Sequence, residues 1–149
     1  MVTSVQLARD AAPFVREISH TADAGFEVTA PTLASCFERA ALGVAAAIVD
    51  LDLVSLREER RLDVRADDRI ALLHDFLHAV LLLAQVDRFL VAGVEIRALN
   101  DHAVGAVLAG EALDPERHRL HGEVKAITWH ELTIELVGGA WRARVILDV

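Results

Sequence analysis

Trp141-Arg-Ala-Arg-Val-Ile-Leu-Asp-Val149 is the stretch from which the fold of this chain is most readily deduced. Its residues alternate in type up to the final valine, which is the pattern of a β-strand with one buried face. The end of a domain is usually polar and frayed. A strand here would instead hold the side chain of Asp148 and the carboxylate of Val149 side by side. Two acidic groups in fixed positions suggest a third oxygen ligand and a cation.

The segments before this strand are also β in pattern. Gly138-Gly139 predicts a tight turn, so residues 123–137 are expected to form one long strand or two bent ones. Residues 91–99 and 103–109 are predicted strands around a turn at Asn100-Asp101. The second half of the chain is therefore a run of strands.

The first half mixes strands with two helices. Strands are predicted at 14–18, 25–30 and 60–65, with the polar residues 20–23 as a turn between the first two. Thr32 is the expected N-cap of a helix whose apolar face is Leu33, Phe37, Ala40, Ala41, Val44 and Ile48. Asp67 or Asp68 is expected to cap a second helix, from Ile70 to about Val86, which is apolar around most of its circumference and should be largely buried.

This order of elements predicts one α+β domain over residues 1–149. Two helices would pack on a mainly antiparallel sheet. A chain of 149 residues with 54% hydrophobic residues is long enough to bury one sizeable core. The single cysteine, Cys36, excludes an internal disulfide and favours a reducing cytoplasm. Neither an ordinary signal peptide nor an apolar run of membrane-spanning length is expected.

The net charge of −8 bears on the class of partner. Proteins that bind nucleic acid directly usually carry a basic stripe, and the basic run at 57–65 is interrupted by acidic residues. Direct, stable binding of RNA or DNA is therefore disfavoured. We expect any role in nucleic-acid chemistry to pass through another protein.

The histidines and the single cysteine are further candidates for functional sites. His74 and His78 lie at i and i+4 with Asp75 between them, as in helical zinc hydrolases, but Asp replaces the usual Glu and no third ligand is evident. The favoured interpretation is the polar edge of a buried helix. His118 and His121 fit solvated loop histidines better than metal ligands. Cys36 lacks a neighbouring base and fits a packing residue.

The acidic residues form a stronger candidate site. Asp23, Asp148 and the carboxylate of Val149 could together bind a hard cation such as Ca²⁺ or Mg²⁺. Alternation also places Arg142, Arg144 and Asp148 on one strand face, so Asp148 fits a surface ion-pair ladder equally well. Asp23 could likewise be only a turn residue. Spacing alone leaves both interpretations open.

Several separated blocks resemble the archease family. They are His20-Thr-Ala-Asp-Ala-Gly-Phe26 with Ala30-Pro-Thr-Leu33, Gly110-Glu111, Glu123-Val-Lys-Ala-Ile-Thr-Trp-His130, and the final stretch from Trp141 to Val149. The match covers nearly the whole chain in the right order. It implies an archease-like fold.

The resemblance also implies a function. Archeases are cytoplasmic accessory proteins of RtcB-type RNA ligases, which join RNA ends bearing a 2′,3′-cyclic or 3′-phosphate and a 5′-hydroxyl. They promote GTP-dependent guanylylation and multiple turnover of the ligase, in tRNA splicing or RNA repair, without being enzymes themselves. The family's metal positions fall on Asp23, Asp148 and Val149, with Ca²⁺ the expected ion and Mg²⁺ or Mn²⁺ the alternatives. Its motif lysine falls on Lys125, with His130 nearby; Lys125 could also simply neutralise an acid.

The chain departs from the family pattern at two places. Its second helix reads Asp75-Phe-Leu-His-Ala79, where archeases usually have Asn and Glu at the last two positions. Trp129 stands where the family commonly has Tyr. A stand-alone metal-dependent hydrolase and a general chaperone or adaptor are the alternative functions. The oligomeric state, the metal, the physiological RNA and the effect of His78 and Ala79 on ligase contact are left open by the sequence.

Overall fold

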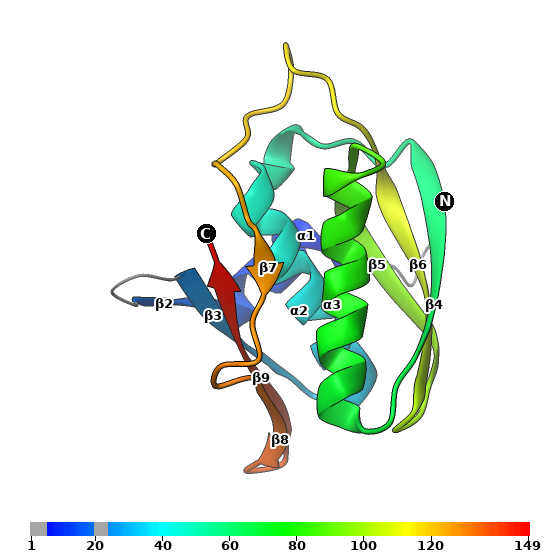
Figure 1. Ribbon diagram of the computed structural model, residues 1–149, viewed down its shortest axis with the longest axis vertical. Helices are drawn as coiled ribbons and strands as arrows, with labels where there is room; N and C mark the ends of the chain where they lie inside the picture. The colour runs from blue at the N-terminus through cyan, green and yellow to red at the C-terminus, as the bar shows by residue number, and fades with distance from the viewer. Residues whose placement is uncertain (1–5, 20–23) are drawn as a thin grey trace.

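The computed structural model describes residues 6–19 and 24–149. Figure 1 shows two long helices lying between two antiparallel sheets. The helices are α2, Leu33–Ile48, and α3, Arg69–Gln85, and the short elements are α1 (Ala8–Ala11), η1 (Ala12–Phe14) and η2 (Leu51–Leu53). The strands are β1 Gln6–Leu7, β2 Val15–Ser19, β3 Ala24–Ala30, β4 Glu58–Arg65, β5 Phe89–Leu99, β6 Ala103–Ala112, β7 Ala126–Ile127, β8 Thr133–Val137 and β9 Ala140–Asp148.

Each sheet combines pairs of consecutive strands with strands from distant parts of the chain. One has the order β1-β5-β6-β4, and the other has the order β2-β3-β9-β7, with β8 also pairing with β9. The α+β class and the antiparallel pairing expected from the sequence are confirmed. The helices, however, are covered by two sheets, where one was expected. Because α3 is apolar on several sides, a single sheet would have left much of its buried face in water.

The helices begin where their capping residues predict. The Thr32 side chain accepts a hydrogen bond from the Ser35 backbone N–H at 3.0 Å, and Ser35 Oγ accepts one from the Thr32 N–H at 3.2 Å. Asp68 caps α3 by accepting from the Ala71 N–H at 2.8 Å. These bonds satisfy N–H groups that a helix start otherwise leaves unpaired.

Between the helices, the rings of Phe37 and Phe76 lie 5.8 Å apart in the core. In the described residues, neither helix combines the length and the apolar character needed to cross a membrane.

Strand β9 runs through the middle of its sheet. Residues 24–30 of β3 pair with residues 141–147 along one edge. On the other edge, β8 pairs with residues 140–144 and β7 with residues 147 and 148. The strand predicted from the final stretch is thus confirmed, and it is hydrogen-bonded on both sides.

Residues 123–137 form two strands, which was one of the two expected alternatives, but both strands are shorter than expected. Only Ala126–Ile127 and Thr133–Val137 join the sheet, because the chain turns away between them. Glu131 has a positive φ of 52°, and the Leu132 N–H donates to the Trp129 carbonyl at 3.3 Å. This turn projects Trp129 from the sheet, with 58% of its surface exposed.

We expect Gly110→Ala to destabilise the fold strongly. A Cβ atom at Gly110 would lie 1.8 Å from the Leu90 carbonyl oxygen, so the backbone of β5 or β6 would have to move. The expected loss in free energy of unfolding is about 3 kcal/mol, measured by urea denaturation. Gly105→Ala in the same strand is the control, since its nearest contact is the Asp63 carboxylate at 3.1 Å. Equal losses for both variants would contradict this prediction.

Candidate functional site

The candidate site lies where β9 ends. Ala24, the first residue of β3, pairs with Leu147, and Ala126 of β7 pairs with Asp148. The Lys125 backbone N–H donates to the Asp148 carbonyl at 2.7 Å. The structure therefore brings together Lys125 and Asp148, two predicted site residues that are far apart in sequence.

Asp23 and its turn, residues 20–23, lie outside the described residues. Its neighbour Ala24 lies opposite Leu147, next to Asp148. The prediction that Asp23 shares a site with Asp148 and Val149 stays a prediction. In residues 6–19 and 24–149, no three His, Cys, Asp or Glu side chains are grouped so as to hold a metal ion.

Asp148 and Val149 are both exposed. Within the described part of the chain, Asp148 makes no ion pair with Arg142 or Arg144. The surface ion-pair ladder, which was the alternative explanation for Asp148, therefore does not include this residue. Arg144 instead contacts Glu27 at 3.4 Å and Glu131 at 3.6 Å. The Asp148 carboxylate is thus accessible at the strand end, beside the oxygens of Val149.

Lys125 is the single lysine of a chain that has 14 arginines. Its side chain is exposed, and its ammonium group makes no ion pair with any residue in the described ranges. The structure thus gives no support, within those ranges, to a role in neutralising a nearby acid. Lys and Arg differ in shape and hydration, since ammonium is a compact point charge and guanidinium a planar fork. A chain that otherwise uses Arg places its one ammonium beside the end of β9.

His130 lies in the turn after β7. Its Nε2 is 3.5 Å from a carboxylate oxygen of Glu131, and its side chain is largely exposed. The predicted role of His130 in ligase activation is not tested by this geometry.

A cavity of about 540 Å³ opens beside the end of the chain. Its polar lining comes from Glu17, His121, Glu123 and Val149, and its floor includes Phe26 and Gly43. Phe26 takes the space that a side chain at position 43 would need, because a Cβ there would lie 2.4 Å from its ring. The cavity thus connects the terminal residue with β3, α2 and the segment that precedes Lys125.

Comparison with known proteins decides the family. Residues 16–149 match the model of the archease protein family (MTH1598/TM1083). The chain belongs to the archease family. It is 37% identical over 136 residues to protein archease of Methanopyrus kandleri, covering 89% of this chain and 97% of that one. It is 38% identical over 134 residues to protein archease of Thermococcus gammatolerans, covering 87% and 94%.

Solved archease-family structures share the fold. The solution structure of Methanobacterium thermoautotrophicum protein 1598 has a TM-score of 0.76 and 33% identity, covering 91% of this chain and 99% of that one. A crystal structure from Thermotoga maritima, described as an archease and possible chaperone, has a TM-score of 0.57 and 18% identity, covering 89% and 94%. The second likeness concerns the fold alone.

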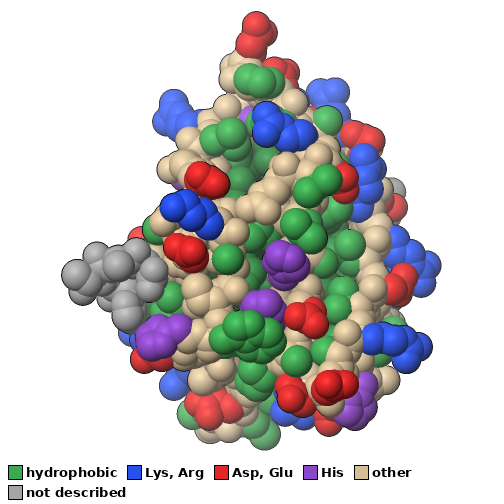
Figure 2. Space-filling model, in the orientation of Figure 1, with side chains coloured by type: hydrophobic (Ala, Val, Ile, Leu, Met, Phe, Trp, Pro, Cys, Tyr) green, Lys and Arg blue, Asp and Glu red, His purple; other side chains and the backbone are tan. Residues whose placement is uncertain are grey.

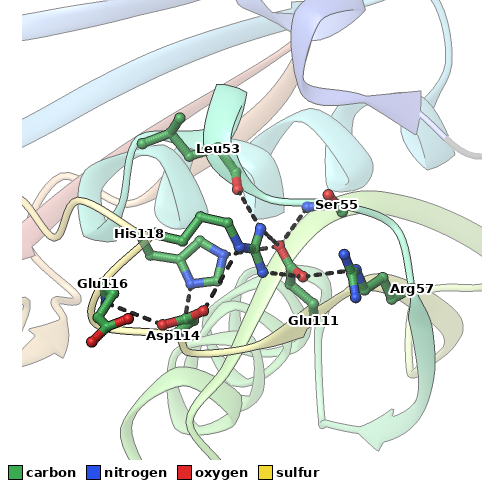
Figure 3. Close-up of polar contacts among 8 residues, drawn as sticks. Leu53, Ser55, Arg57, Glu111, Asp114, Glu116 and His118 are labelled. Atoms are coloured by element: carbon green, nitrogen blue, oxygen red, sulfur yellow. Dashed lines mark hydrogen bonds and ion pairs between the residues drawn. The ribbon is translucent and has the colours of Figure 1, made fainter.

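In this archease, a buried carboxylate fixes the loop that leads from β6 to Lys125. Figure 3 shows Glu111 between the stretch that precedes β4, with Ser55 and Arg57, and the loop after β6, with His118. Arg117 binds both of its oxygens, at 2.7 and 2.8 Å, and the Ser55 N–H donates at 2.7 Å. Arg57 adds an ion pair at 3.3 Å. The two hydrogen bonds from Arg117, together with those from Ser55 and His118, hold the pKa of Glu111 well below its usual range in spite of burial.

His118 belongs to the same network, and its expected exposure is wrong. Its side chain is fully buried, with Nε2 2.9 Å from Glu111 and Nδ1 accepting from the Asp114 N–H at 2.8 Å. Because Nδ1 accepts, the proton of the neutral ring lies on Nε2 and is donated to Glu111. His121, in contrast, is exposed as expected. Its backbone N–H donates to the Ile48 carbonyl at 2.9 Å, which ties the loop to α2.

His74 of α3 has a structural role, in agreement with the interpretation favoured above. His74 Nε2 donates to the Ile127 carbonyl at 2.9 Å, and Nδ1 lies 3.0 Å from the Asp75 carboxylate. Neither nitrogen is left for a zinc ion. Cys36 is buried, which raises the pKa of its thiol to about 12, so it packs and does not react.

Sequence reasoning missed the network around Glu111 and the contact between α3 and β7. Glu111 and Arg117 are six residues apart across a loop, and Ser55 is more than fifty residues away. The three residues do not follow the regular spacing of a helix or a strand, so no sequence pattern indicates that they lie together. The available signal was Glu111 itself, a charged residue at the end of an otherwise small and apolar strand.

We expect Glu111→Gln to lower the free energy of unfolding by about 2–4 kcal/mol, because it removes the charge that pairs with the partly buried Arg117. In the wild type, the folded pKa of Glu111 lies below its usual value of about 4.5. Its contribution is therefore complete above that value and is lost as the pH falls toward the folded pKa.

Urea unfolding at a series of acidic pH values should show a weaker pH dependence for Glu111→Gln than for the wild type. Glu58→Gln is the control, since its ion pair with Arg60 is exposed and should contribute less than about 1 kcal/mol. Identical pH dependence in wild type and Glu111→Gln would contradict the conclusion that Glu111 has a lowered pKa in the folded protein.

Proposed function

We propose that this archease is a non-catalytic, cytoplasmic accessory protein of an RtcB-type RNA ligase. It promotes the GTP-dependent guanylylation of the ligase and its multiple turnover, in tRNA splicing or RNA repair. Lys125, His130 and Asp23 act in ligase activation. Asp23, Asp148 and Val149 bind a divalent cation, for which we expect Ca²⁺ before Mg²⁺ or Mn²⁺.

The observation that carries this proposal is the placement of the single lysine. Lys125 is fixed to Asp148 by a backbone hydrogen bond of 2.7 Å, while its ammonium group is exposed and unpaired within the described ranges. A structural charge on the surface could have been Arg, as it is at all other basic positions. An accessible ammonium group on a fixed backbone is suited to contact phosphate or carboxylate groups at a partner's active site.

The overall charge supports a protein partner over RNA itself. At −8, the chain would repel a phosphate backbone, whereas a ligase that holds RNA must carry basic surface. Complementary charge would speed association of the two proteins. The acidic body and its single, exposed lysine fit an accessory protein that acts through protein contact.

The donors described at the end of β9 fit a hard cation. The Asp148 carboxylate and the oxygens of Val149 are accessible and adjacent, and Ca²⁺ and Mg²⁺ prefer carboxylate and carbonyl oxygen. The bound cation would supply positive charge that screens the acidic groups near Lys125. Lys125 would then keep its ammonium group available to the partner.

We expect Lys125→Ala to reduce stimulation of ligase guanylylation about tenfold or more, since charge-assisted hydrogen bonds contribute roughly 1.5–3 kcal/mol. Lys125→Arg should restore only part of the effect. The measurement follows incorporation of radiolabelled GMP into a purified RtcB-type ligase with GTP and divalent metal.

Arg65→Ala is the matched control, because Arg65 is an exposed basic residue at the end of β4, in the other sheet. Full stimulation by a folded Lys125→Ala variant would refute the role of Lys125. Turnover of substrate without ligase would favour a metal-dependent hydrolase, and suppression of aggregation of unrelated proteins would favour a general chaperone.

We expect Asp148→Asn to weaken Ca²⁺ binding roughly tenfold, because affinity at such sites depends on the number of charged ligands. Isothermal titration calorimetry measures the change, and Asp67→Asn, at an exposed turn before α3, is the control. An extension added after Val149 should also weaken binding if the terminal carboxylate is a ligand. Unchanged affinity in Asp148→Asn would exclude this carboxylate from the site.

A further inference from the structure

One exposed face of α3 carries a continuous row of aromatic and apolar side chains. His74, His78, Leu82 and Val86 follow one another at intervals of four residues, which places them along one side of the helix and its C-cap. Trp129 from the turn after β7 extends this row. We call these five residues the α3 ridge. Leu82, Val86 and Trp129 are 38%, 70% and 58% exposed.

The α3 ridge is held in one conformation. The rings of Trp129 and His74 stack with centroids 3.7 Å apart and an interplanar angle of 12°, and those of His74 and His78 stack at 6.3 Å with the same angle. Because the Ile127 carbonyl and Asp75 hold both nitrogens of His74, the middle ring cannot turn freely. An exposed Trp that is already ordered loses little entropy on binding, which suits an interface anchor.

The ridge is the one uncovered side of a buried helix. Seven residues of α3 are buried on its other sides. Single exposed apolar residues are common, but a contiguous row with a Trp at its end marks an interaction surface. In Figure 2, histidine and hydrophobic side chains gather over this face, with Asp and Glu side chains around them.

The ridge adjoins the candidate site. Ile127 of β7, which accepts the hydrogen bond from His74, is two residues from Lys125, which directly precedes β7. Asp75, whose side chain is 46% exposed, and the exposed Asp87 directly follow ridge residues in sequence, and Asp148 lies across β7. A partner on the ridge would therefore also reach Lys125, and it would meet a rim on which these three aspartates outnumber the exposed Arg88.

We propose that the α3 ridge is the docking surface for a basic, RNA-handling protein that accepts Trp129 in an apolar pocket. Resting on the proposed function, this partner is the ligase. The acidic rim complements a basic protein surface and repels RNA. The ridge then supplies affinity, and Lys125 supplies activation. His78 and Trp129, which both depart from the family pattern, each stack on His74 within this surface.

Fluorescence of Trp129 reports docking directly. In a Trp141→Phe background, Trp129 is the only tryptophan. Adding the ligase should shift its emission to shorter wavelength and protect it from acrylamide quenching, as a buried indole requires. Single-stranded RNA without ligase should leave the emission unchanged. Quenching by RNA alone, or unchanged emission with a ligase that the protein stimulates, would overturn the proposal.

Variants separate docking from activation. Trp129→Ala and Leu82→Glu should weaken ligase binding at least about 30-fold. At saturating concentration, both should still reach the wild-type rate of guanylylation. Lys125→Ala should show the reverse, with near-normal affinity and a low maximal rate. Leu136→Glu is the control, since Leu136 is 60% exposed but lies on β8.

A charge placed within the α3 ridge tests the charge of the partner's surface. Val86→Lys should weaken binding at least about threefold more than Val86→Glu, with the difference shrinking as salt is added. Equal effects of the two substitutions on binding would overturn the proposal that the partner's surface is basic. Failure of the wild type to bind or stimulate the ligase would refute the proposed function itself. Normal stimulation by the wild type with unchanged affinity in the Trp129 and Leu82 variants would refute the docking surface alone.

Discussion

Hydrogen bonding along both edges of β9 is the constraint on which the rest of the structure depends. Residues 141–147 pair with β3 on one side, and β8 and β7 share the other. The strand end is fixed because Lys125 donates to Asp148 across the last position of the ladder. Without this pairing, Asp148 and Val149 would lie on a loose tail, and Lys125 would have no defined place relative to them. The same ladder that closes the sheet thus positions the candidate site.

The fold also requires the chain to cross from one sheet to the other between β6 and β7. Residues 113–125 make this crossing without regular structure, and polar contacts replace the missing ladder. Glu111 and Arg117 fix the start of the crossing, the Asp50 N–H donates to the Arg119 carbonyl, and Gln85 donates to the Val124 carbonyl at 2.8 Å. Each contact satisfies a polar group that the crossing would otherwise leave unpaired. The buried ion pair of Glu111 is therefore explained by the position of Lys125 at the far end of the crossing.

Local patterns predicted the elements well, and the misses have physical causes. Thr32 and Asp68 set the helix starts because capping depends on neighbours three residues away. The second sheet was missed because periodicity shows that α3 is apolar on several sides but not how many layers cover it. His118 was placed in solvent because its partner, Glu111, is buried by a loop rather than by an element with a period. Lys125 and Asp148 emerged as site residues from resemblance and strand pattern, while their pairing required the register of β7 and β9.

The distribution of Lys and Arg in this chain indicates which basic residue has a functional role. Fourteen of its fifteen basic residues are Arg, so the composition shows no general preference for Lys on the surface. Guanidinium groups account for the structural contacts, including the bidentate pair of Arg117 with Glu111 and the stacking of Arg39 on Phe14. The ammonium group of Lys125 takes part in none of these within the described ranges. A position that retains the flexible, compact cation, on a rigid backbone and beside accessible carboxylates, is better explained by what it contacts in a partner than by what it contributes to the fold.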